Sequence, residues 1–144
     1  MKETLSSAET LAAAEQAALT KTKLGTRKTL VLAALAGAYI AIGGTLSLLV
    51  GYGFAQAAAG NPGLQKLLSG AMFPLGLILV VLAGAELFTG NNAVLMPGAL
   101  ARRDGWGKVA RNWTLVWMGN LAGALFFTYF LVVLPGVLSS EMWR

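Results

Sequence analysis

Long stretches without a charged side chain constrain this sequence more than any other feature. Residues 29–65 and residues 112–140 contain no Lys, Arg, Asp or Glu, and residues 67–101 carry a single charge, at Glu86. A helix that crosses a bilayer needs about 20 mainly apolar residues. We therefore expect an all-α integral membrane protein with three transmembrane helices. The expected spans cover about residues 30–54, 69–100 and 112–134.

Composition excludes several classes of function. The sequence contains no Cys and no His, so disulfides, thiol chemistry and imidazole ligands or bases are excluded. Its six acidic residues lie mostly near the chain ends, which argues against a metal site, and we expect no cofactor. No nucleophile–base pair or phosphate-binding loop stands out, so we expect no enzyme. Basic residues that flank spans explain the net charge of +5, so we expect the lipid bilayer, and not nucleic acid, as a partner.

The distribution of basic residues predicts which side of the membrane the N-terminus faces. Five lie before the first span, four follow the second span, and two lie on the opposite side. By the positive-inside rule, this excess places the N-terminus in the cytoplasm. In that order the residues are Lys2, Lys21, Lys23, Arg27 and Lys28, then Arg102, Arg103, Lys108 and Arg111, and finally Lys66 and Arg144.

The N-terminal segment, residues 1–28, is polar and rich in Ala, and much of it consists of strong helix formers. A short helix lying at the membrane surface and a solvated tail are both compatible with this composition. We expect this cytoplasmic segment to precede a membrane domain over residues 29–144.

The second expected span is too long for one straight helix and contains a polar interruption. Residues 89–92 read TGNN, a poor helix-forming stretch inside an apolar region. Irregular backbone at membrane depth is tolerated only where protein or a water-filled cavity surrounds it. We therefore expect this helix to be broken at mid-membrane, with its loop at residues 89–92, and the break indicates a pore or a substrate site.

Glu86 lies next to this interruption, where a carboxylate costs at least about 3 kcal/mol and usually faces a cavity or a partner. Two roles remain open for it. It is either a structural clamp that accepts hydrogen bonds from N–H groups freed at the break, or a group that handles protons or substrate. Thr89, Asn91 and Asn92 leave a similar choice between lining a polar passage and bonding the loop backbone.

The third expected span carries a pattern of small residues. Gly119 and Gly123 are four residues apart, a spacing that favours close contact between helices. Asn120 lies between them, and we expect its side chain to form hydrogen bonds across helices.

Several of these segments together resemble the formate/nitrite transporter family. They are residues 73–91, FPLGLILVVLAGAELFTGN, and residues 112–127, NWTLVWMGNLAGALFF. Residues 36–44, AGAYIAIGG, resemble the first span of that family, and Trp106-Gly107-Lys108 fits its loop. The resemblance covers nearly the whole chain beyond about residue 24.

The resemblance implies an aquaporin-like channel fold in the bacterial inner membrane. Family members are pentamers whose protomers have six spans, arranged as two inverted repeats with a broken second helix in each. Their substrates are small monovalent anions such as formate and nitrite, and proton-linked transport follows as a hypothesis because a neutral acid crosses an apolar constriction more cheaply than its anion.

The resemblance also assigns roles to individual positions. Phe73 and Leu77 match positions near one apolar constriction, and Leu87 and Phe88 match positions near the other. Thr89 matches the polar residue of the loop between the helix halves, and Asn91 follows it in the expected pathway. Glu86 matches the acidic position before that loop.

The sequence has three of the family's six spans, and it lacks the pore histidine of the second repeat. We expect transport of small monovalent anions by a half-length member of the family, either as a homo-oligomer or with a second chain that supplies the missing repeat. A truncated form and one half of a split transporter both remain open, whereas the strong bias of basic residues argues against a protein that pairs with itself in antiparallel fashion. The alternative function is a non-conducting fragment or partner subunit that assembles with a full-length or complementary second half.

Overall fold

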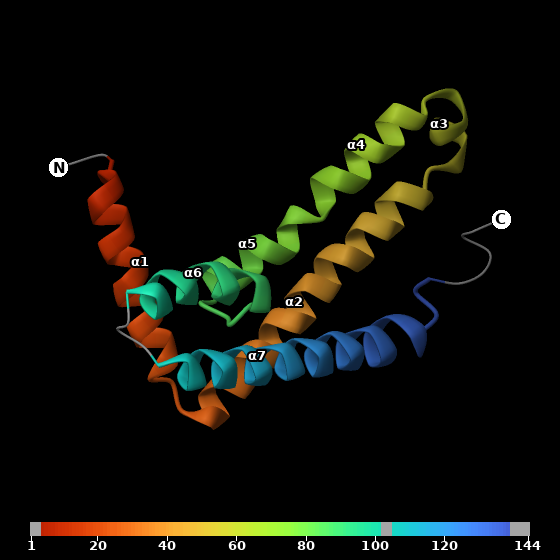
Figure 1. The fold of residues 1–144 in the computed structure, drawn as a ribbon. Coiled ribbons are helices and arrows are strands. Elements are labelled where there is room, and N and C mark those ends of the chain that lie inside the picture. Colours follow the sequence, from red (N-terminus) through yellow and green to blue (C-terminus); the bar gives the residue numbers. More distant parts are fainter. Residues whose placement is uncertain (1–3, 102–104, 139–144) are drawn as a thin grey trace.

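A computed structural model describes residues 4–101 and 105–138, and all regular elements in those ranges are helices (Figure 1). Three of the helical stretches, Thr26–Tyr52, Pro62–Leu82 and Trp106–Val133, are long and apolar enough to cross a membrane. The expectation of an all-α membrane fold with three long apolar helices is thus confirmed. The elements in order are α1 (Ser7–Thr22), α2 (Thr26–Tyr52), α3 (Ala55–Gly60), α4 (Pro62–Met72), α5 (Pro74–Leu82), α6 (Phe88–Leu100), α7 (Trp106–Phe127) and the π-helix η1 (Thr128–Val133). Lys2, Arg102, Arg103 and Arg144, which contribute to the expected orientation, lie outside the described residues.

The interruption in the second apolar stretch lies earlier than the sequence predicts. The structure places it at residues 83–87, whereas residues 89–92 form the first turns of α6. Gly84 has a φ of 60°, a left-handed conformation that favours Gly and that follows the end of α5. Leu87 is extended and directly precedes α6 as its N-cap. Predicting a loop at TGNN was wrong because a Gly and short polar side chains are tolerated in the first turns of a helix, and the left-handed Gly84 decides where the chain turns.

The connection after α2 is itself helical, because α3 and α4 follow it along the chain. Asn61, Pro62 and Gly63 mark the start of α4. The Asn61 side chain accepts a hydrogen bond from the backbone N–H of Leu64 at 3.1 Å, and Pro62 occupies the first turn of α4. Asn is a favoured N-cap and Pro a favoured first helical residue, so the same residues that mark turns also mark this helix start.

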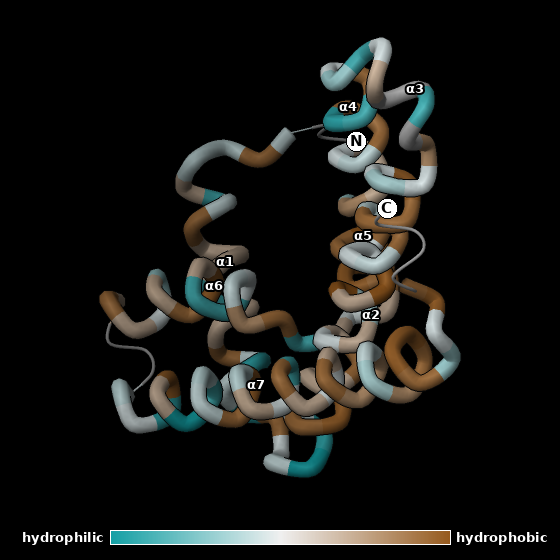
Figure 2. Tube along the Cα trace, turned by 90° about the vertical axis from the view of Figure 1, so that its right-hand side faces the viewer, coloured by the Kyte–Doolittle hydropathy of each residue, from teal (hydrophilic) through white to brown (hydrophobic). Residues whose placement is uncertain are grey.

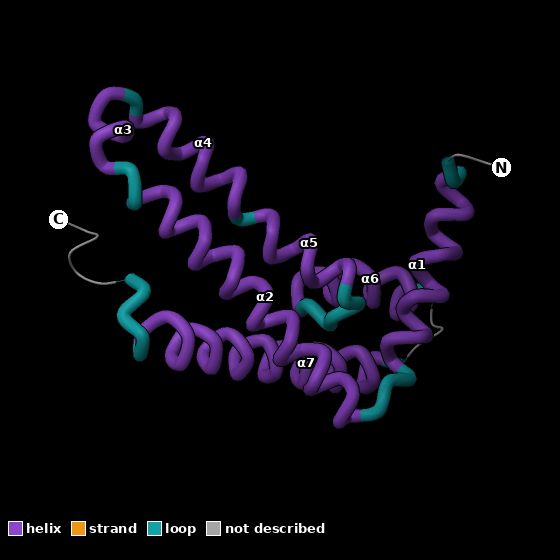
Figure 3. Tube along the Cα trace, turned by 180° about the vertical axis from the view of Figure 1, so that it is seen from behind, coloured by secondary structure: helices purple, strands orange, loops and turns teal. Residues whose placement is uncertain are grey.

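The N-terminal segment contains the helix α1, which lies against α6 (Figures 1 and 3). Its start is fixed by a capping box, in which the Ser6 side chain and the Glu9 side chain each bind the other residue's backbone N–H. Ala18 is fully buried and packs with residues of α6 and α7 in a small apolar core, completed by Leu95, Ala99 and Val109 with Trp113 against it. Of the two alternatives for this segment, the structure has the helix; its contact with a membrane surface stays a prediction.

Small residues bring α2 and α7 into close contact where they cross (Figure 1). A Cβ added at Gly123 would lie 1.8 Å from the carbonyl oxygen of Ala34, and one at Gly37 would lie 2.0 Å from that of Asn120. A Cβ at Gly119 would meet the side chain of Ala33 at 2.5 Å. The close approach expected at Gly119 and Gly123 is therefore confirmed. It also brings the backbone of each helix within hydrogen-bonding reach of side chains on the other.

A second contact joins α2 to the joint between α4 and α5. Gly43 lies against the backbone of Phe73 and Gly76, and a Cβ at Gly43 would lie 2.7 Å from the Phe73 carbonyl oxygen. Farther along α2 and α4, the hydroxyl groups of Ser47 and Ser69 each lie within hydrogen-bond distance of the other residue's carbonyl oxygen, at 2.9 and 3.0 Å, and the two hydroxyl oxygens are 2.9 Å apart. These contacts hold the α4–α5 arm alongside α2.

Much of the apolar surface of these helices is not covered by this chain. Figure 2 shows hydrophobic residues along α2, α5 and α7 at the outside of the structure. Val81 and Leu82 at the end of α5 are 70% and 80% exposed. Such surface requires lipid or further polypeptide around it, since large exposed apolar patches mark membrane or protein contacts.

The adjacent residues Gly43 and Gly44 give a matched test of this packing. Gly43→Ala should destabilise the fold by about 1–3 kcal/mol, because the added methyl group meets backbone that cannot move aside. Gly44 has open space where its Cβ would lie. Gly44→Ala should therefore be neutral or stabilise the helix by up to about 1 kcal/mol. Unfolding of the two variants in detergent measures the difference, and equal stability would contradict the contact.

Candidate functional site

The chain leaves helical geometry over residues 83–87, and several of its backbone groups there are bonded within the protein. The N–H groups of Gly84 and Ala85 donate back to carbonyl oxygens of α5, at 3.2 and 3.0 Å. The N–H of Glu86 crosses to α2 and donates to the carbonyl oxygen of Leu32 at 3.3 Å. The break is therefore anchored to α2 as well as to the helices that it joins.

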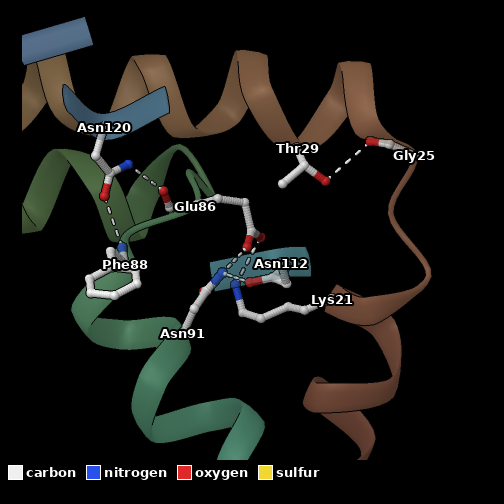
Figure 4. A network of polar contacts seen from close by, with 8 residues as sticks. All are labelled: Lys21, Gly25, Thr29, Glu86, Phe88, Asn91, Asn112 and Asn120. Atoms are coloured by element: carbon white, nitrogen blue, oxygen red, sulfur yellow. Dashed lines mark hydrogen bonds and ion pairs between the residues drawn. The ribbon is translucent and has the colours of Figure 1, made fainter. Parts of the chain in front are cut away.

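Asn120 of α7 bonds the other side of the break (Figure 4). Its amide group donates to the carbonyl oxygens of Ala33 and Glu86 at 2.8 and 2.9 Å. Its oxygen accepts from the N–H of Phe88, the first residue of α6, at 2.9 Å. One side chain thus bonds α2, the break and the start of α6 together, which confirms the expectation that Asn120 bonds across helices.

The carboxylate of Glu86 is buried, with the residue only 4% exposed. It accepts hydrogen bonds from the ammonium group of Lys21 at 2.8 Å and from the side-chain amide of Asn91 at 2.6 Å (Figure 4). The same Asn91 amide also donates to the side-chain oxygen of Asn112 at 2.9 Å. The donors to the carboxylate are therefore side chains, and not the N–H groups of the break that the clamp hypothesis named.

Lys21 is the member of this cluster that sequence reasoning missed. It lies in the last turn of α1, and it was counted only as one of the basic residues that set orientation. Nothing in the sequence separates it from its basic neighbours, because its contact with Glu86 spans 65 positions. The pair with Glu86 is a salt bridge in which Lys21 is 23% and Glu86 is 5% exposed at the side chain.

A depression of about 270 Å³ lies beside the break. Apolar side chains from α5 and the break, including Leu77 and Leu87, form most of its wall, and Gly84 and Gly90 leave space in it. Lys21 and Asn91 contribute the polar groups. A second depression of about 500 Å³ shares Lys21 and Gly84 and is also lined by Lys28 and Glu86. Lys21 thus borders both spaces.

The structure brings together three of the predicted pathway residues, because Leu77, Leu87 and Asn91 line the same depression. The other three lie elsewhere. Phe73 is 48% exposed at the α4–α5 joint, Phe88 begins α6 and is half-buried, and Thr89 is exposed in the first turn of α6. Placing Thr89 in a loop was wrong, for the same reason that the break was placed too late.

Acidic and other ligand side chains do not gather into a metal centre in the described ranges. Among residues 4–101 and 105–138 there is no group of three or more His, Cys, Asp or Glu that could hold an ion. Glu86 is bonded to an ammonium group and an amide, both of them hydrogen-bond donors. Glu86, Lys21 and Asn91 thus form a hydrogen-bonded cluster beside an apolar depression.

Comparison with known proteins gives a consistent result. Residues 8–144 match a family model described as "Formate/nitrite transporter". The chain is 47% identical to a "Probable formate transporter" of Methanothermobacter thermautotrophicus over 140 residues, which are 96% of this chain and 50% of that protein. It is 40% identical to the "Formate channel FocA" of Escherichia coli K12 over 116 residues, 79% of this chain and 39% of that protein. The chain spans about half the length of the first of these relatives and less than half the length of the second.

The role of Asn120 can be tested against a second asparagine. Asn120→Ala removes the partners of one N–H and two carbonyl groups, and each buried polar group left unpaired costs about 1–3 kcal/mol. Asn92 is a suitable control, because its side-chain oxygen is buried without a hydrogen-bond partner in the described structure. Asn92→Ala should therefore cost much less. Unfolding in detergent compares the two variants, and an equal loss of stability would contradict the role of Asn120.

Proposed function

Because this chain belongs to the formate/nitrite transporter family, we propose that it supplies one wall of a membrane pathway for small monovalent anions such as formate and nitrite. The relatives compared above are named as a transporter and a channel, and neither name is that of an enzyme.

The observation that carries the proposal is the apolar depression with one ammonium group at its edge. Leu77 of α5 and Leu87 at the end of the break line it, and Lys21 borders it. An apolar constriction excludes bulk water and larger polar solutes, and it gates passage by dewetting. Lys21 is paired with Glu86, so it offers a nearby anion the short-range dipole of that pair. Together these groups favour a small, singly charged anion.

The roles of the individual residues follow from this arrangement and from the family resemblance. Leu77 and Leu87 form the apolar constriction of this wall, and Asn91 holds the polar edge in place through its hydrogen bonds to Glu86 and Asn112. Phe73, Phe88 and Thr89 are assigned to the pathway by resemblance, and in this structure they lie outside the depression. Glu86 holds Lys21 in place, and it is also the acid through which proton movement would act.

The depression is open on one side, and we propose that further polypeptide closes it. Val81, which lines it, is 70% exposed. The closing surface comes from another copy of this chain or from a second chain with the complementary repeat, and by the family resemblance the assembly is a pentamer. We place it in a bacterial inner membrane with the N-terminus in the cytoplasm, as the basic residues favour.

Proton linkage is part of the same proposal. Moving a bare charge through a low-dielectric constriction is far costlier than moving a neutral molecule. Formate and nitrite are both anions of weak acids, so each has a neutral protonated form. Transport in which the anion takes up a proton before it enters the constriction avoids most of that cost.

Flux measurements with two tryptophan variants test the pathway. Leu77→Trp should reduce formate and nitrite flux in proteoliposomes to the level of protein-free liposomes, because the larger ring fills the depression. Leu82→Trp is the control, since Leu82 is on the same helix, is 80% exposed and is absent from the lining of the depression. Equal effects of the two variants would contradict the proposal. No flux from well-folded wild-type chain would favour the non-conducting fragment or partner subunit.

Proton linkage is tested by the pH outside the liposomes. Acidifying the outside should raise the initial rate of formate uptake, because a larger share of the substrate is neutral and enters the constriction at lower cost. Protein-free liposomes measured at each pH correct for passive entry of the neutral acid. Equal corrected rates at acidic and alkaline outside pH would argue against proton linkage while leaving anion transport intact.

A further inference from the structure

Basic side chains gather where α2 and α7 begin. Arg27 and Lys28 lie in the first turn of α2 and are both exposed. Arg111 of α7 is also exposed, and its guanidinium group donates to the hydroxyl of Thr26 at 2.5 Å. This bond fixes a cation from α7 beside the start of α2, so three positive side chains share one corner of the molecule.

These three cations are not neutralised by the ion pair described above. The salt bridge found among the described residues joins Lys21 to Glu86, and it involves none of these three cations. Positive charge therefore accumulates at one end of the two longest apolar helices. The nearest partner that a membrane offers at such a place is an anionic headgroup, since basic residues near the surface are attracted to anionic lipids.

A depression of about 600 Å³ lies against this corner. Its wall combines the backbone at Gly25, the side chains of Arg27 and Lys28, and the apolar side chains of Val31 and Leu32. It is thus cationic at one edge and apolar at the other. A soluble anion would use only the first of these surfaces, whereas an amphiphile would use both.

The apolar edge continues along α2. Arg27, Val31 and Leu35 are spaced four residues apart, so they lie on one face of the helix. Val31 is 54% and Leu35 is 41% exposed. From the start of the helix, this face therefore carries first a cation and then exposed apolar side chains. A lipid leaflet has the same order, with the charged headgroup first and the acyl chain below it.

We propose that this corner binds an anionic phospholipid. Arg27 and Lys28, with Arg111 beside them, hold the phosphate and headgroup, and one acyl chain lies over Val31 and Leu35. The lipid neutralises the cluster and covers apolar surface that the chain itself leaves open. Binding depends on α2 and the start of α7, and it uses none of the residues that line the depression of about 270 Å³ in the proposed pathway, so the two proposals fail or succeed separately.

The experiment is native mass spectrometry of the purified chain in mild detergent, titrated with phosphatidylglycerol or with phosphatidylcholine of the same acyl chains. The wild-type chain should retain phosphatidylglycerol in preference to phosphatidylcholine. Each basic residue near an anionic surface changes affinity by about fivefold, so Arg27→Gln with Lys28→Gln should weaken phosphatidylglycerol binding by about 25-fold. Phosphatidylcholine binding should change little.

Matched variants separate the site from charge in general and from folding. Lys66→Gln removes a cation from α4 and should leave the preference unchanged. Arg27→Lys with Lys28→Arg keeps both charges and should restore binding, and circular dichroism with size-exclusion chromatography checks that each variant is folded. The proposal is overturned if the double Gln variant keeps the wild-type preference. It is also overturned if glycerol 3-phosphate, which has the charge without acyl chains, displaces the lipid at equal concentration.

Discussion

A peptide group that leaves a helix within a membrane protein must find a hydrogen-bond partner in the protein or in a water-filled cavity, because lipid offers none. Residues 83–87 face this constraint, and partners on α2 and α7 meet it. The Leu32 carbonyl accepts a hydrogen bond from the N–H of Glu86. The Asn120 side chain donates to the carbonyl of Glu86 and accepts from the N–H of Phe88. A break in this position is therefore possible only while α2 and α7 lie together.

The close packing of those two helices has its own cause in the sequence. Gly37 and Gly123 let one backbone approach the other so closely that a methyl group would not fit. At that separation Asn120 reaches both the Ala33 carbonyl and the break. The glycines thus act on the site indirectly, because they set the distance over which an amide side chain bonds three segments.

Sequence reasoning succeeded where a pattern is local and failed where it depends on the fold. The charge-free stretches predict three long apolar helices, and the spacing of Gly119 and Gly123 predicts their close contact. The loop at residues 89–92 was wrong because helix propensity does not reveal which Gly adopts a positive φ, and here it is Gly84. The pairing of Lys21 with Glu86 could not be predicted, because the docking of α1 against α6 and α7 alone brings these residues together.

The pairing of Lys21 with Glu86 has a consequence for how long an anion would stay in the proposed pathway. An isolated ammonium group in an apolar space would hold an anion tightly, since opposite charges attract strongly at low dielectric. Here the carboxylate 2.8 Å away cancels most of that attraction at a distance. What remains is a short-range dipole, which an anion meets only when it is close. Conduction requires binding weak enough for release, so the neutral pair favours a short residence time over tight capture.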